Sequence, residues 1–139
     1  MARYSLDTNT LTYILRKNPD VVAKFEAALA ARHDFLLCPF VYYESKRGLL
    51  AEDKKSYLSS LERIVSRFRW LEFEEGVWAK AMQGWAMARR LGRSPGDADL
   101  LIAAHALHFS AVLVTANVKD FEFFPGLQIE NWAATGAGA

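Results

Sequence analysis

Short apolar runs alternate along the chain with longer stretches in which apolar residues recur every three or four positions. The longer stretches predict helices, because side chains at this spacing fall on one helical face. Strands that alternate with helices are typical of an α/β domain with a mainly parallel sheet. We therefore expect a three-layer domain in which helices flank a central sheet. The short runs predict strands at 4–6, 35–38, 70–73, 111–115 and 127–130.

Local signals set the limits of the predicted helices. The turn Asn18-Pro19-Asp20 ends the first helix, and Asp20 is placed to cap the second. The helix predicted over 74–91 has one strongly apolar face, which we expect to pack in the core rather than to bind a cofactor. That face carries Val77, Trp78, Ala81, Met82 and Trp85.

Composition limits the class of protein further. With 139 residues the chain favours one domain, which we place at 1–132, followed by a flexible tail of small residues at 133–139. Lys and Arg number 17 against 16 Asp and Glu, and the net charge of +1 excludes a polycation that binds nucleic acid by total charge alone. The single cysteine, Cys38, excludes an internal disulfide and a cysteine-rich zinc module, and its apolar neighbours predict burial.

Neither end of the chain nor its interior carries a membrane signal. Asp7 follows the N-terminus too closely for the apolar core of a signal peptide. Every apolar run is shorter than the roughly 18 residues that cross a bilayer. These features predict a soluble cytoplasmic protein with no membrane partner.

Polar residues follow several of the predicted strands. In open parallel sheets ligands bind beyond the carboxyl ends of the strands, and Asp7, Glu44, Asp99 and Asn117 could converge there. Three carboxylates that face one another repel without a cation, and Mg²⁺ or Mn²⁺ suits an all-oxygen site. We therefore hypothesise a divalent-cation site at this edge.

Each of these residues also has a purely structural interpretation. Asp7 and Asp97 could cap helices, and Asp99 lies where a helix dipole favours a carboxylate. Glu44 could be a solvated helix residue, and Asn117 an ordinary turn former. The conjunction of all of them favours a site more strongly than any single member does.

Two histidines and several basic clusters are further candidates for metal or nucleic-acid contacts. His105 and His108 are close enough on one predicted helix for a metal pair, but their alanine- and leucine-rich helix and the lack of a cysteine partner favour structural roles. Basic clusters are commonly solvated helix faces. The best candidates for phosphate contacts are Arg89, Arg90 and Arg93, whose loop leads to Asp97 and Asp99, followed by Lys46 and Arg47.

Three sequence blocks resemble a known family. Residues 4–9 (YSLDTN) and 99–104 (DLLIAA) resemble the opening and central helix of PIN-domain ribonucleases. Residues 113–121 (LVTANVKDF), with the later 125–127 and 131–132, resemble the C-terminal part of VapC toxins of bacterial toxin–antitoxin pairs. The blocks occur in the family's order, which implies a PIN-like fold.

The middle of the chain departs from the family pattern. Members usually have Glu-Leu and then a small residue, whereas residues 43–48 read YESKRG, with Glu44 at the matching position. Asn117 falls where members have Asp or Asn. Supporting roles at the site are assigned to Asp97, Asp120 and Thr115.

The resemblance implies a Mg²⁺-dependent endoribonuclease, with Mn²⁺ as a substitute ion. Asp7 and Asp99 would hold the metal, and Glu44 and Asn117 would complete the site. The family precedent is cleavage of tRNA or ribosomal RNA to a 3′-hydroxyl and a 5′-phosphate, by a homodimer silenced by a cognate VapB-type antitoxin.

Two alternatives remain at this point. A receiver domain would need paired acids after the first strand, where this chain has Asp7 alone. A non-catalytic PIN-like module, serving as an RNA-binding or scaffolding subunit, is the other alternative. The presence of Asp7, Glu44 and Asp99 favours the enzyme.

Overall fold

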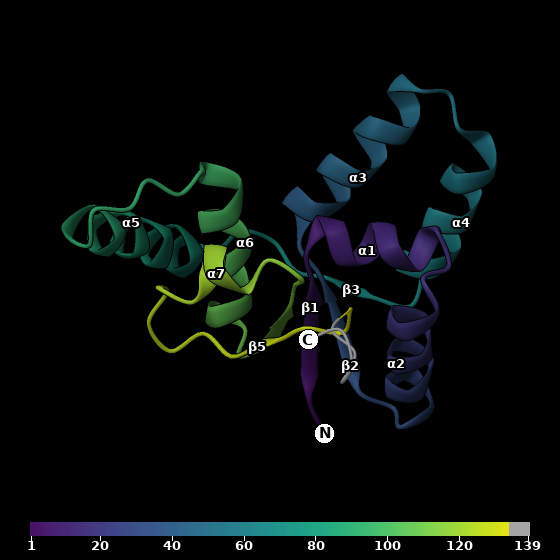
Figure 1. Cartoon of the computed structure of the whole chain (residues 1–139), viewed down its shortest axis with the longest axis horizontal. Coiled ribbons are helices and arrows are strands. Elements are labelled where there is room, and N and C mark those ends of the chain that lie inside the picture. The colour runs from purple at the N-terminus through teal and green to yellow at the C-terminus, as the bar shows by residue number, and fades with distance from the viewer. Residues whose placement is uncertain (134–139) are drawn as a thin grey trace.

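The computed structural model describes residues 1–133. Within that range seven helices flank a five-stranded, all-parallel sheet of order β3-β2-β1-β4-β5. Helices α1–α4 lie on the right of the sheet in Figure 1 and α5–α7 on the left. The strands are β1 (Arg3–Leu6), β2 (Asp34–Leu37), β3 (Arg69–Trp70), β4 (Val112–Val114) and β5 (Ile129–Glu130). The helices are α1 (Thr8–Leu15), α2 (Pro19–Ala30), α3 (Pro39–Ala51), α4 (Lys55–Val65), α5 (Glu75–Arg90), α6 (Asp97–His108) and α7 (Val118–Phe121).

The predicted α/β architecture is confirmed, with differences at the ends of elements. The edge strands β3 and β5 are only two residues long, and each pairs with a neighbour on one side only. The one-turn helix α7 has no apolar periodicity, and sequence reasoning missed it.

The N-cap of α2 is Asn18, whose side chain accepts from the backbone N–H groups of Asp20 and Val21, both at 3.1 Å. The predicted capping by Asp20 is therefore wrong, and Asp20 lies in the first turn instead.

The core lies on both faces of the sheet, as expected for parallel strands covered by helices. Strand residues such as Leu36 and Leu113 are almost completely buried. Cys38 follows β2 and is buried as predicted, and burial raises the pKa of its thiol to about 11. On one side of the sheet an aromatic cluster packs edge to face and in stacks; its members are Tyr4, Phe25, Phe35, Phe68 and Trp132.

Helix α5 packs differently from the sequence prediction. Its buried positions are mainly small residues, which let α5 approach its neighbours closely; they are Val77, Ala81, Gly84 and Ala88. Gly84 is required by this approach, since a Cβ there would lie 2.4 Å from a ring carbon of the buried Phe124. The large residues instead face solvent: Trp78, Met82 and Trp85 are 48%, 67% and 47% exposed. The prediction that these three belong to the core is wrong, because small residues took that place.

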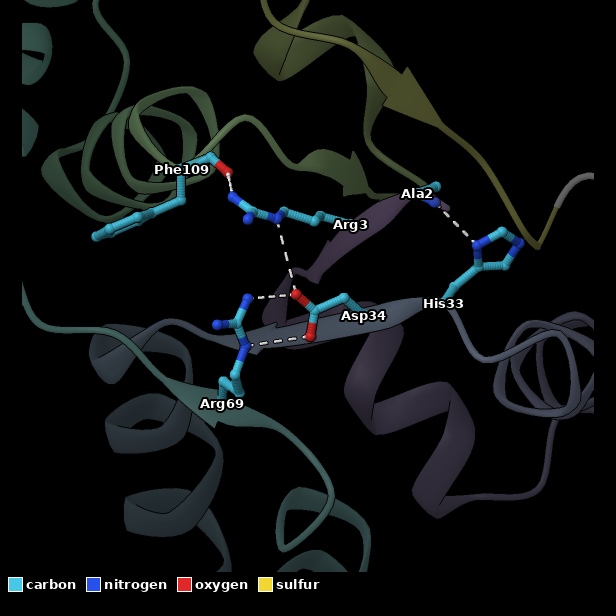
Figure 2. A network of polar contacts seen from close by, with 6 residues as sticks. All are labelled: Ala2, Arg3, His33, Asp34, Arg69 and Phe109. Carbon is cyan, nitrogen blue, oxygen red and sulfur yellow. Dashed lines mark hydrogen bonds and ion pairs between the residues drawn. The ribbon is translucent and has the colours of Figure 1, made fainter.

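The amino ends of three strands are joined by charged side chains (Figure 2). Asp34 at the start of β2 accepts hydrogen bonds from the Arg69 guanidinium at the start of β3. The same carboxylate lies 3.7 Å from Nε of Arg3 on β1, whose Nη1 donates to the Phe109 carbonyl at 3.1 Å. Asp34 thus has a cation on each side, and its contacts with Arg3 and Arg69 link β1, β2 and β3 at this end.

Two further expectations concern the limits of the domain. Of the predicted tail at 133–139, Ala133 packs against the core, and residues 134–139 lie outside the described residues. None of the helices within residues 1–133 combines the length and apolar character needed to cross a bilayer.

Candidate active site

Asp7 stands at the carboxyl end of β1, where it caps α1. Its Oδ1 accepts from the Thr10 backbone N–H at 2.7 Å, and its own N–H donates to the Val114 carbonyl at 3.1 Å. The side chain is buried, with the residue 4% exposed. The capping role and the site position therefore belong to the same carboxylate, and its cap holds it rigidly at the sheet edge.

Thr115 links Asp7 to Asn117, another predicted site residue at the carboxyl end of the sheet. It follows β4, is fully buried, and hydrogen-bonds Asp7 through its hydroxyl. The same hydroxyl accepts the backbone N–H of Asn117 at 3.0 Å. The backbone of Asn117, the N-cap of α7, is thereby linked to the Asp7 carboxylate through the Thr115 hydroxyl, and Asn117 is exposed.

Glu44 comes from the adjacent helix α3 and is held by a residue that the sequence analysis missed. The Thr8 hydroxyl donates to Glu44 Oε1 at 2.6 Å, and Arg47 Nη2 lies 3.9 Å from Oε2. Thr8 directly follows Asp7, so the first turn of α1 supports two acids at once. Nothing in the sequence pairs Thr8 with Glu44, because only the packing of α1 on α3 brings them together.

The acids are close enough to disturb one another's protonation. Burial raises the pKa of Asp7, hydrogen bonds from Thr115 and Thr10 oppose that rise, and the Glu44 charge adds to it. Partial burial also raises the pKa of Asp99 at the start of α6, and three neighbouring carboxylates raise it further; they are Asp120, Asp7 and Glu44. The four predicted site residues thus lie at one edge, where negative charge is concentrated.

This donor set fits a divalent cation. Mg²⁺ binds oxygen ligands, commonly one or two carboxylates together with water and substrate phosphate. Within residues 1–133 no group of three or more His, Cys, Asp or Glu side chains encloses an ion-sized position. The carboxylates are of the type that binds Mg²⁺, but among the described residues they form no ready-made metal cage.

The two additional acids predicted near the site lie in different places. Asp120 lines the same hollow as Asp99 and contributes to its raised pKa. Asp97 is the first residue of α6, and Gly96 is the N-cap, so the predicted capping by Asp97 is wrong. Asp97 lines an apolar hollow with Trp78 and Leu101, and the structure does not group it with the other acids.

The basic residues proposed for phosphate contacts separate in the same way. Arg47 lies beside Glu44, and Arg93 lines the hollow that contains Asp99. Lys46 instead donates to the Tyr42 hydroxyl one turn earlier on α3 and lies 3.2 Å from Glu62 on α4. The Tyr42 and Glu62 contacts raise the pKa of Lys46.

The two remaining candidates, Arg89 and Arg90, lie on α5. The Arg89 guanidinium covers the Trp85 ring, and Arg90 lines a hollow beside Phe124.

His105 and His108 have separate partners. His105 is buried with Nε2 at 2.7 Å from the Leu71 carbonyl, whereas His108 lies between Lys80 and Glu74.

Known proteins are similar to this chain in both sequence and architecture. Residues 4–123 match the PIN domain family. Ribonuclease VapC2 of Rickettsia felis is 32% identical over 130 residues, which cover 93% of this chain and 97% of the relative. The tRNA(fMet)-specific endonuclease VapC of Salmonella typhimurium is 28% identical over 135 residues, covering 95% and 99%. The crystal structure of VapBC2 from R. felis bound to a DNA fragment from their promoter matches with a TM-score of 0.84 and 30% identity, over 94% of this chain and 98% of that chain.

The chain therefore belongs to the PIN domain family and, within it, to the VapC type. The resemblance seen in the three sequence blocks is confirmed, since the match extends across nearly the whole chain. The five parallel strands and their flanking helices agree with the fold that this family implies.

Proposed function

We propose that this protein is a divalent-metal-dependent endoribonuclease, the toxin of a toxin–antitoxin pair. One observation carries the proposal: four segments far apart in sequence bring Asp7, Glu44, Asp99 and Asn117 to one end of the sheet, where burial and neighbouring carboxylates raise the pKa of Asp7 and of Asp99. Crowding of like charges lowers the stability of the fold. Such crowding is expected where the acids serve to bind a cation and a phosphodiester.

Asp7 and Asp99 would hold Mg²⁺, or Mn²⁺ in its place. When bound, the ion supplies Lewis-acid polarisation of the phosphodiester and lowers the pKa of a water. Glu44, anchored by Thr8, and Asn117, anchored through Thr115, orient the water and the scissile phosphate. Arg47, beside Glu44, attracts the RNA backbone. The products are a 3′-hydroxyl and a 5′-phosphate.

The relatives support particular partners. The S. typhimurium relative is named as a tRNA(fMet)-specific endonuclease, which makes tRNA the first substrate to test, ahead of ribosomal RNA. The R. felis relative was solved as VapBC2, which supports a VapB-type antitoxin for this chain. An RNA substrate and an antitoxin partner both support a location in the cytoplasm.

The exposed apolar face of α5 supports a homodimer. Trp78, Met82 and Trp85 line a hollow with Leu100 and Leu101, and large apolar side chains clustered at a surface mark sites of association. A second copy of the chain would remove these rings from water.

The deciding experiment is cleavage of tRNA and ribosomal RNA by purified variants in Mg²⁺. Asp7→Asn and Asp99→Asn keep side-chain size and remove ligand charge, and Asn retains the cap at Asp7. We expect each to lower the cleavage rate by at least about 100-fold, with unchanged circular dichroism. The 5′-phosphate ends are identified by sequencing.

The matched control is Asp53→Asn, at an exposed position between α3 and α4 with a φ of 50°, which Asn also adopts readily. It should cleave like the unmodified protein. Metal-dependent cleavage that persists in both site variants would remove the proposed site. Absence of cleavage by the unmodified protein on every RNA would favour the non-catalytic module.

A further inference from the structure

A hollow of about 230 Å³ opens directly beside Asp99. It lies between the loop that joins α5 to α6 and the short helix α7. Its walls include Arg93, Lys119, Asp120 and Phe123. Whatever occupies this hollow would touch the edge of the proposed cleavage site.

Arg93 is exposed yet held in place by three contacts. Its backbone N–H donates to the Ala88 carbonyl at 2.8 Å, and Nη1 donates to the Lys119 carbonyl at 3.2 Å. The guanidinium carbon lies 5.8 Å from the centroid of the Phe123 ring, above its face. Phe123 in turn packs on the buried Phe124. Arg93 is thus held over Phe123 and remains open to solvent.

We infer that the Arg93–Phe123 pair is a stacking platform for an unpaired base next to the scissile phosphate. This inference rests on the proposed ribonuclease function and adds a base contact at the edge of that site. A guanidinium plane stacks on aromatic rings and on unstacked bases alike. The hollow places such a base beside Asp99, and Lys119 lines the same wall, near the adjoining phosphate.

The geometry favours stacking over a plain phosphate contact. The carbonyl and the ring set the orientation of the guanidinium plane before the RNA arrives. A stacking contact depends on that orientation more than a simple charge–charge contact does. Duplex RNA keeps its bases stacked on one another, so it cannot use the platform.

The test measures binding of a fluorescent single-stranded oligoribonucleotide, and of the same strand annealed to its complement, in an Asp7→Asn background that does not cleave. Arg93→Lys keeps the charge and removes the plane. Arg67→Lys, at an exposed position just beyond α4, is the matched control. We expect Arg93→Lys to bind the single strand about 10-fold more weakly than the control does. Duplex binding and the salt dependence of binding should be unchanged.

Phe123→Leu removes the ring that supports the guanidinium, and we expect a loss of single-strand affinity in the same direction, with thermal melting confirming its fold. Equal binding by Arg93→Lys and the control would overturn the platform. An equal loss for single strand and duplex would assign Arg93 to phosphate and overturn it as well.

The two proposals fail in different ways. If the protein with native Asp7 cleaves RNA in Mg²⁺ and Arg93→Lys has no effect on single-strand binding, only the platform is wrong. If it neither binds nor cleaves RNA, the ribonuclease assignment falls, and the platform falls with it.

Discussion

The two ends of the sheet treat charge in opposite ways. At the amino end, Asp34 lies between two guanidinium groups, those of Arg3 and Arg69 (Figure 2). At the carboxyl end, Asp7 and Asp99 lie near further carboxylates, and the pKa of each is raised. Both ends are built from the same parallel strands, so the fold does not decide which arrangement occurs. The charges of the amino end are paired and serve the structure, whereas the carboxyl end concentrates like charges that could bind a cation.

This contrast explains why an acid at one end should matter for stability and an acid at the other for chemistry. Asp34 has its partners within the chain. The acids of the carboxyl end have hydrogen bonds from Thr8, Thr10 and Thr115, and Glu44 lies near Arg47, but Asp7 and Asp99 face further carboxylates. The following predictions test that difference.

Divalent cation should stabilise the carboxyl end. In roughly tenfold excess over its Kd, Mn²⁺ should raise the melting temperature by about 3–5 °C, because the ion binds only when the acids are brought together. Thermal scans with and without Mn²⁺ measure the shift. Asp99→Asn should lose most of it, and Asp34→Asn should keep it. An identical shift in both variants would place the ion elsewhere.

Loss of the amino-end charge should reduce stability without affecting cleavage. Asp34→Asn leaves Arg3 and Arg69 without their anion, and we expect the free energy of unfolding to fall by about 1 kcal/mol, since these partners are half exposed. Urea denaturation measures this loss, and high salt should diminish it. Asp53→Asn serves again as the neutral reference. A drop in cleavage rate by the folded Asp34→Asn protein would contradict the division between the two ends.

The smallest expected effect is on the pH dependence of stability. Because the folded-state pKa of Asp99 is raised, its contribution to stability is present below the unfolded-state pKa and is lost as the pH rises through the folded-state pKa. In cation-free buffer, Asp99→Asn should therefore melt higher than the unmodified protein at about pH 7 and equally at about pH 3. The melting difference is measured in chelator-treated buffer across that range. A difference that grows toward acid pH would show that Asp99 is stabilised in its charged form.

The sequence predicted the order of strands and helices, because each element depends on a local pattern. A strand followed by Asp7 and a helix whose first turn carries Asp99 can be recognised without knowing what lies beside them. The contact of Thr8 with Glu44 could not be predicted, since it depends on how α1 packs against α3. The same holds for Thr115, whose dual contact with Asp7 and Asn117 depends on the pairing of β1 with β4.

The apolar face of α5 was misassigned for a related reason. Periodicity shows which side chains share a face, but it does not show which face meets the core. In α5 the small residues Ala81, Gly84 and Ala88 allow close packing, and the larger Trp78 and Trp85 are left outside. Burial was therefore decided by interhelical distance rather than by hydrophobicity.

The two-residue strands at the edges of the sheet have a consequence for how this chain meets other chains. A long exposed edge offers a row of unpaired amides to any passing strand and invites fibre-like aggregation. Strands β3 and β5 offer almost no such row. A toxin of this shape can accumulate and still resist strand-to-strand polymerisation, and its associations are directed to helical surfaces.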